Sequence, residues 1–116
     1  MPRPRKCRRV CAAPRCTRFE PFGAADAEAV VLQVDEFETL RLMDYEGLTQ
    51  EACALRMGVA RTTITGIYTR ARRKVAVALA EGRPLHIHGG AFEVCTGGGC
   101  ACGHGSCPRA KDGFQP

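Results

Sequence analysis

The spacing of apolar and polar residues changes several times along this chain, and each change predicts a new helix or strand. Residues 30–34 (VVLQV) are dominated by β-branched side chains and follow a turn-like stretch, which predicts a short strand. Asp35 is then expected to cap a helix, because Glu38 three residues later completes a capping-box pattern. This helix is expected to run to about Tyr45 and to end at Gly47.

Residues 49–69 (TQEACALRMGVARTTITGIYT) have the spacing of a helix-turn-helix. Thr49 is expected to cap a short helix, and Gly58 can adopt the positive φ that turns the chain. A third helix is predicted from about Ala60 to Ala80, because Gly82 and Pro84 follow it. The expected inner positions of the helical hairpin are Cys53, Ala54, Met57, Val59, Ile64 and Ile67.

A second strand is expected at residues 85–88 (LHIH), where it could pair with residues 30–34. The predicted fold is therefore mainly α: a three-helix helix-turn-helix domain, sigma region-four-like or winged-helix-like, with a short two-stranded pairing and flexible Cys-rich tails. Three segments are expected along the chain: a basic, Cys-containing arm (1–23), the helical domain (24–90), and a Gly/Cys-rich tail (91–116) that is disordered or organised by a metal.

The net charge of the 116 residues is +5, but positive and negative residues are concentrated in different segments of the chain. Residues 1–20 carry seven Arg and Lys and one Glu, whereas residues 21–60 carry eight acids and two arginines. Residues 61–83 are basic again, with six Arg and Lys and one Glu. A charge run is often only solvated surface, but here the basic blocks coincide with the arm and with the third helix. The pattern favours a polyanionic partner, double-stranded DNA.

Two sets of residues are predicted to contact DNA. On the third helix, early side chains would meet base edges in the major groove and later cations would meet phosphates. The alternating Pro and Arg residues of the arm suit an extended chain in a minor groove. The predicted contacts are Arg61, Thr62, Thr65, Gly66, Thr69, Arg70 and Arg73 on the helix, and Arg3, Arg5, Lys6, Arg8 and Arg9 in the arm.

The cysteines suggest metal chemistry, because eight cysteines in a reducing compartment are more often ligands or redox-active thiols than disulfides. The tail has the spacing C-x4-C-x-C-x4-C, which four thiolates of a zinc site or an iron–sulfur cluster could use, although it fits no standard ferredoxin run. These ligands would be Cys95, Cys100, Cys102 and Cys107, and a weaker second set is Cys7, Cys11 and Cys16.

Several separate stretches of residues 1–90 closely resemble a widespread prokaryotic family of small proteins that carries a domain-of-unknown-function label. They are MPRPRKCRRV, DEFETLRLMDYEGLTQEACALRMGVARTT, ARRKVAVALAEG and LHIHGG. The resemblance implies DNA binding through a helix-turn-helix akin to sigma-factor region four. It also implies a link to accessory proteins of the iron–molybdenum-cofactor-binding type. The family usually has Ser at the position of Ala60 and Arg at the position of Gly66, so target preference does not transfer directly.

The leading functional hypothesis is a DNA-binding transcriptional regulator that responds to metal or redox state, with a homodimer expected by analogy to other helix-turn-helix proteins. The alternative is a metal- or cluster-handling accessory protein that uses the helical hairpin to contact a protein. An enzyme is not expected, because no glycine-rich phosphate loop or catalytic cluster is present in the sequence. The arginine-rich start, with no apolar stretch after it, predicts no signal peptide, and the longest apolar run near the core, Val75 to Ala80, is too short to span a membrane. A cytoplasmic protein is therefore expected.

Overall fold

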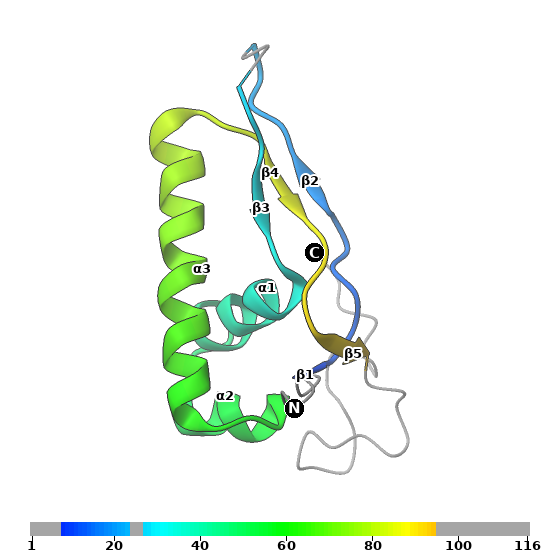
Figure 1. The fold of residues 1–116 in the computed structure, drawn as a ribbon, viewed down its shortest axis with the longest axis vertical. Coiled ribbons are helices and arrows are strands. Elements are labelled where there is room, and N and C mark those ends of the chain that lie inside the picture. The colour runs from blue at the N-terminus through cyan, green and yellow to red at the C-terminus, as the bar shows by residue number, and fades with distance from the viewer. Residues whose placement is uncertain (1–7, 24–26, 95–116) are drawn as a thin grey trace, which may run out of the picture.

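In the part of the chain that the structure describes, three α-helices and two small sheets form the fold, and the longest helix packs beside a three-stranded sheet (Figure 1). The computed structural model describes residues 8–23 and 27–94. The elements in chain order are β1 (Arg8–Val10), β2 (Arg18–Phe19), β3 (Val30–Leu32), α1 (Val34–Leu40), the π-helical turn η1 (Arg41–Tyr45), α2 (Gln50–Met57), α3 (Arg61–Glu81), β4 (Leu85–Ile87) and β5 (Phe92–Val94).

The larger sheet has the strand order β2-β4-β3. Strand β3 pairs in parallel with β4, with Val30 opposite Leu85 and Leu32 opposite Ile87. The predicted pairing of residues 30–34 with 85–88 is therefore confirmed. Strand β2 adds an antiparallel partner on the other edge of β4, which the sequence pattern did not indicate because β2 has only two residues.

The smaller sheet joins the two ends of the described chain. Strands β1 and β5 run parallel, with Arg8 opposite Phe92 and Val10 opposite Val94. Val10 is buried and contacts the hydrophobic core. Neither strand was predicted, because residues 1–23 and 91–116 show no clear hydrophobic period, and the pairing is long-range.

Helix α1 begins two residues earlier than its sequence pattern suggests. Gln33 is the N-cap, and the backbone N–H of Gln33 donates to Oε1 of Glu36 at 2.8 Å. The predicted cap at Asp35 is thus wrong, and Asp35 and Glu38 lie inside the helix, where both are buried. The physical reason is that Val34 enters the core as the first helical residue, so the preceding polar residue must cap the helix.

The predicted hairpin of two helices is present. The Thr49 side chain accepts a hydrogen bond from the N–H of Ala52, which caps α2 as expected. Gly58 ends α2 in the left-handed region with φ +70°, and α3 then runs from Arg61 to Glu81. The backbone conformation therefore favours glycine here, and a Cβ atom on Gly58 would also displace the guanidinium of Arg9, whose carbon it would approach to 2.9 Å.

Helix α3 connects two clusters of buried side chains that together form the core. Near its N-terminus, Ile64 packs with residues of η1 and α2, and further along Ala71 packs against the sheet. One cluster contains Leu42, Cys53, Ala54, Met57 and Ile64, and the other contains Val10, Leu32, Val34, Ala71 and Ile87. The sheet and the hairpin therefore hold α3 from one side and leave its opposite side exposed.

Candidate nucleic-acid interface

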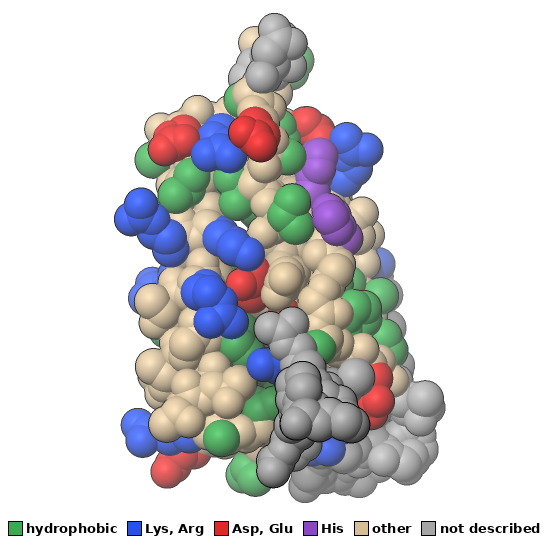
Figure 2. Space-filling view, viewed as in Figure 1, with side chains coloured by type: hydrophobic (Ala, Val, Ile, Leu, Met, Phe, Trp, Pro, Cys, Tyr) green, Lys and Arg blue, Asp and Glu red, His purple; other side chains and the backbone are tan. Residues whose placement is uncertain are grey.

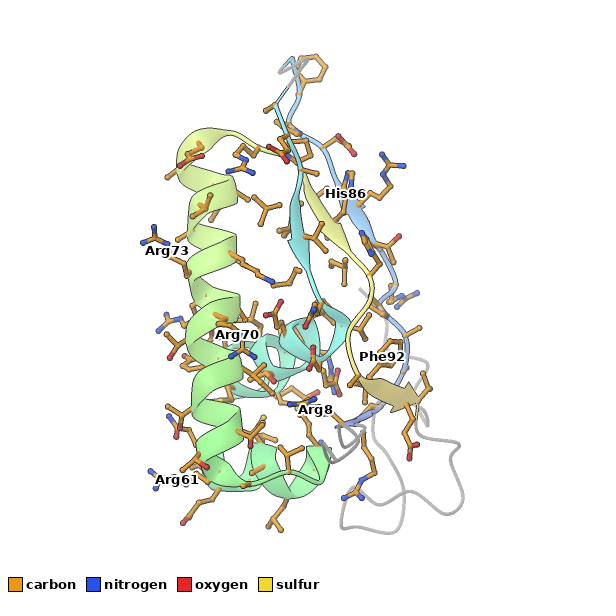
Figure 3. The ribbon with its side chains drawn as sticks, in the orientation of Figure 1. Arg8, Arg61, Arg70, Arg73, His86 and Phe92 are labelled. Carbon is orange, nitrogen blue, oxygen red and sulfur yellow. The ribbon has the colours of Figure 1, made fainter. Side chains whose placement is uncertain are left out.

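The exposed side of α3 carries a row of arginine and threonine side chains. Arg61, Thr65, Thr69 and Arg73 follow one another at steps of four residues, with Thr62 beside them, so the row winds by about 40° around the helix at each step and by about 120° from Arg61 to Arg73. Figure 3 shows the labelled Arg61 and Arg73 pointing away from the sheet, and Figure 2 shows Lys and Arg side chains gathered along α3. The row is therefore a solvent-facing strip on the longest helix.

The two arginines of this strip differ from most other cations of the fold. Among the described residues, the side chains of Arg61 and Arg73 make no hydrogen bond or ion pair. The threonines, in contrast, are held in place: Thr65 Oγ1 donates to Gln50 Oε1 at 2.8 Å, and Thr69 Oγ1 donates to the Thr65 carbonyl at 2.9 Å. The strip thus combines two unpaired cations with ordered hydroxyl groups.

Arg70 and the neighbouring Lys74 instead face a buried carboxylate. Arg70 Nε lies 3.5 Å from Glu36 Oε2, and Lys74 Nζ lies 2.8 Å from Glu36 Oε1. Figure 3 shows Arg70 on the sheet-facing side of α3, unlike Arg73. Arg72 lies 3.5 Å from Asp44 Oδ2 and its guanidinium carbon lies 5.1 Å from the Tyr68 ring centre. A phosphate would have to compete with these partners.

Arg8 and Arg9, the two predicted DNA contacts of the arm that lie in the described residues, are held within the protein. Arg8 Nε lies 3.6 Å from Asp35 Oδ2, and Figure 3 shows Arg8 between the small sheet and α3. Arg9 donates to the carbonyl groups of Leu55 and Arg56 at the end of α2, at 3.1 and 3.4 Å. Arg9 therefore satisfies carbonyls that the helix leaves unpaired. Arg3, Arg5 and Lys6 lie outside the described residues.

Three buried carboxylates on α1 form the centre of this ion-pair network, which sequence reasoning missed. Asp35, Glu36 and Glu38 are 1–2% exposed, whereas the sequence pattern suggested a capping role at an exposed helix start. Glu38 accepts two hydrogen bonds of 2.9 Å from Arg41 and one of 3.0 Å from the Cys11 N–H. The available signal was Arg41, three residues after Glu38, a spacing that brings the two side chains together on one side of the predicted helix.

Burial and pairing shift the ionisation of this network in opposite directions. Burial raises the pKa of Asp35, and the neighbouring Arg8 only partly offsets that effect. For Arg41, burial alone would lower the pKa, but hydrogen bonds and charge attraction from Glu38 outweigh it, so its pKa lies above the ordinary value. Arg41 is therefore a cation inside the protein, and its Nη2 lies 2.9 Å from Glu38 Oε2.

Two residues near the start of α3 stabilise the helix less than other residues would at the same positions. Ala60 occupies the N-cap and supplies no side-chain acceptor, and Gly66 lies in the helix interior. A Cβ on Gly66 would meet only Arg70 Nη1, at an ordinary 3.5 Å. Both positions therefore accept a better residue without a clash.

We expect Ala60→Ser and Gly66→Ala each to raise the free energy of unfolding by about 1 kcal/mol, through a new cap and a better helix former respectively. Urea unfolding followed by circular dichroism measures this. Gly82→Ala is the matched control: Gly82 has φ +66°, so the same change there should lower stability. A loss of stability in Gly66→Ala would contradict the prediction.

The cysteines of the described chain do not form a cluster. Cys11 and Cys53 are buried, Cys16 is exposed, and no group of three or more His, Cys, Asp or Glu side chains in residues 8–23 and 27–94 is arranged to hold a metal. Cys53 packs in the core against Met57, as its sequence position predicts. Cys7 and the tail cysteines Cys95, Cys100, Cys102 and Cys107 lie outside the described residues.

Burial should make Cys53 unreactive. It raises the pKa of the Cys53 thiol to about 12, which reduces the thiolate fraction at neutral pH by roughly 1,000-fold. In a brief treatment of the folded protein with iodoacetamide, we expect peptide mass mapping to find Cys16 alkylated and Cys53 unmodified. In urea both should react. Equal labelling of Cys53 and Cys16 in the folded protein would contradict this burial.

Comparison with known proteins identifies the family of the chain. A family model described as a protein of unknown function, DUF134, matches residues 1–95. A UPF0251 protein of Desulfitobacterium hafniense is 50% identical over 113 residues, covering 96% of this chain and 90% of the relative. Two other UPF0251 proteins are also similar. The protein of Desulforudis audaxviator is 51% identical over 105 residues, covering 84% of this chain and 69% of the relative. The protein of Thermoanaerobacter pseudethanolicus is 46% identical over 96 residues, covering 81% of each.

The chain therefore belongs to the UPF0251 (DUF134) family, as its sequence motifs indicated. No solved structure matches it. None of the helices in the described part of the chain has the length and apolar character needed to cross a bilayer.

Proposed function

We propose that this protein binds double-stranded DNA through α3, with α2, the Gly58 turn and α3 acting as a helix-turn-helix, and that it regulates transcription. The observation that carries the proposal is the exposed strip of α3, which presents Arg61 and Arg73 without side-chain partners among the described residues. An α-helix fits the major groove of B-DNA, and arginine and threonine suit contacts to bases and phosphates.

The charge of α3 supports this assignment. No Asp or Glu occurs between Glu51 and Glu81, so the whole exposed strip lacks negative charge. The first N–H groups of a helix also attract anions, and Ala60 provides no side chain that would occupy them. Arg61 and Arg73 are separated by about 18 Å along the axis, which could bring both to phosphates on either side of one groove.

The two parts of the basic N-terminal arm have different roles in this proposal. Arg8 and Arg9 anchor β1 to α1 and to the end of α2. The segment with Arg3, Arg5 and Lys6 joins the described chain at Arg8, so it is attached near the turn between α2 and α3. We assign DNA contact to that segment and a positioning role to Arg8 and Arg9.

The test is binding of the full-length protein to a fluorescent duplex from its own genome, measured by anisotropy between about 50 and 200 mM salt. We expect log K to fall linearly with log[salt], with a slope that reports several phosphate contacts. A footprint would then define the site. Absence of any salt-dependent DNA binding, with the protein folded, would overturn the proposal and favour contact of the hairpin with a protein.

A further inference from the structure

Two threonines in the exposed strip of α3 donate their hydroxyl protons within the protein. Thr65 Oγ1 lies 2.8 Å from Gln50 Oε1 and 3.2 Å from the Arg61 carbonyl oxygen. Thr69 Oγ1 lies 2.9 Å from the Thr65 carbonyl oxygen. A threonine hydroxyl has one proton and two acceptor lone pairs. Both side chains are exposed to solvent, yet neither has a proton left to donate to a partner.

The Gln50 contact connects the two helices of the hairpin. Gln50 is the first residue of α2, and its side chain reaches Thr65 on α3, 15 residues further along the chain. The use of the proton does not depend on how the Gln50 amide is oriented. With the amide reversed, Gln50 Nε2 donates to Thr65 Oγ1, and the hydroxyl donates to the Arg61 carbonyl. Contacts with two residues therefore fix the Thr65 side chain before a partner binds, which lowers the entropy cost of binding.

The hydrogen bonds also determine which part of each threonine meets a partner. Bonding of the hydroxyl to the carbonyl four residues earlier selects one of the rotamers that threonine adopts in a helix. The oxygen then faces the preceding turn of α3, and the methyl group is the other branch at Cβ. Thr65 and Thr69 therefore offer a partner an apolar methyl group and an oxygen that only accepts.

This combination matches one kind of base pair in the major groove. Guanine presents N7 and O6 there, two acceptors that a threonine without a free proton leaves unsatisfied. Cytosine presents an amino donor but no methyl group. Only an A·T pair presents a methyl group, on thymine C5, together with an amino donor, on adenine N6. Arg61 has the opposite preference, because a guanidinium only donates and suits guanine or a phosphate.

We infer that Thr65 recognises the C5-methyl group of a thymine in the bound DNA and that Gln50 is the residue that positions it. Thr69 offers the same contact four residues further along, which is about 6 Å on the helix axis. The inference rests on the proposed function, because it assigns a base preference to the same strip of α3. It identifies Thr65 as a specificity-determining residue, whereas Arg61 and Arg73 carry the proposal of DNA binding itself.

Replacing thymine with uracil tests this contact, because uracil pairs with adenine in the same way and lacks only the methyl group. A duplex that the full-length protein prefers is first selected from a random pool. Each thymine in that duplex is then replaced with uracil, one position at a time, and binding is measured by anisotropy. We expect one or two positions at which uracil weakens binding by about fourfold, the effect of one buried methyl group.

Two substitutions assign this effect to Thr65. Thr65→Ser keeps the hydroxyl but removes the methyl group, so thymine and uracil should bind equally at one of these positions. Thr65→Val keeps a methyl group but removes the hydroxyl, so the preference for thymine should remain. Thr17→Ser is the matched control, because Thr17 is exposed before β2 and outside α3, and it should leave every thymine-to-uracil ratio unchanged. Circular dichroism checks that each variant folds.

The outcomes distinguish this inference from the proposed function. Absence of salt-dependent DNA binding by the folded protein would overturn both. DNA binding in which every uracil replacement is neutral would overturn the methyl contact and leave DNA binding by α3 in place. The same conclusion would follow if Thr65→Ser prefers thymine to uracil as strongly as the wild-type protein at every position.

Discussion

Replacing Arg61 and Arg73 together with alanine should weaken DNA binding by at least tenfold and flatten its salt dependence. Each phosphate contact contributes about −0.9 to the slope of log K against log[salt]. We therefore expect each single substitution to reduce the steepness by about 1 and the double substitution by about 2. Anisotropy titrations at several salt concentrations measure affinity and slope together.

The control is Arg18→Ala, which removes the same charge from strand β2. Arg18 is exposed and lies beside Glu20, on the sheet rather than on α3. Its loss should change affinity only slightly through the overall field of the protein. If Arg18→Ala flattens the slope as much as Arg61→Ala, binding follows net charge and the α3 strip is not the contact surface.

The slope also separates contact residues from positioning residues. Arg9 holds the end of α2 through two carbonyl groups, so Arg9→Ala should lower stability and affinity but leave the salt slope unchanged. The sequence alone placed Arg8 and Arg9 with the DNA contacts, because a basic run looks the same whether it faces solvent or protein. Their partners, Asp35 and the end of α2, are 27 and 46 or more residues away in the chain.

The features that the sequence predicted correctly depend on local geometry. Thr49 can cap only the helix that begins directly after it, Gly58 is one of few residues that adopt φ +70° freely, and Ile64 and Ile67 repeat at helical spacing. The N-cap of α1 was predicted wrongly because two capping-box patterns overlap there, Gln33 with Glu36 and Asp35 with Glu38. Glu36 caps with Gln33, and this frees Asp35 and Glu38 to enter the interior, which no local pattern indicates.

Strand pairing and the ion-pair network depend on contacts between distant segments. Strands β1 and β5 are more than 80 residues apart in the chain, and each has only three residues, which is too short to show a period of two. Glu36 meets Lys74 38 residues away. Such contacts become predictable only once α1 is known to pack against α3.

Glu38 is the carboxylate of this network that joins Arg41 of η1 to the N-terminal segment. It is 1% exposed, it accepts two hydrogen bonds from the buried Arg41, and it accepts one from the Cys11 N–H next to β1. A buried charge that loses its partner carries its full desolvation cost. Glu38 thus connects the stability of α1 to the position of the N-terminal segment.

We expect Glu38→Ala to lower the free energy of unfolding by about 3–5 kcal/mol, because Arg41 would remain buried and charged with Glu46 as its remaining carboxylate. The melting temperature should fall by roughly 10 °C or more. The Cys11 amide should also exchange with solvent faster, because its acceptor is lost. Thermal melts followed by circular dichroism, and hydrogen exchange followed by mass spectrometry, measure the two effects.

One further substitution separates charge from shape at Glu38, and a second, at Glu51, is the control. Glu38→Gln keeps an acceptor for the Cys11 N–H but removes the charge, so it should cost less stability than Glu38→Ala while still weakening the Arg41 pair. Glu51→Ala, at an exposed position in the first turn of α2, should change stability by less than about 1 kcal/mol. If Glu38→Ala melts within a few degrees of Glu51→Ala, then Arg41 finds another partner or water. The ion pair would then contribute little, and the position of β1 would depend on Val10 and on the pairing with β5 instead.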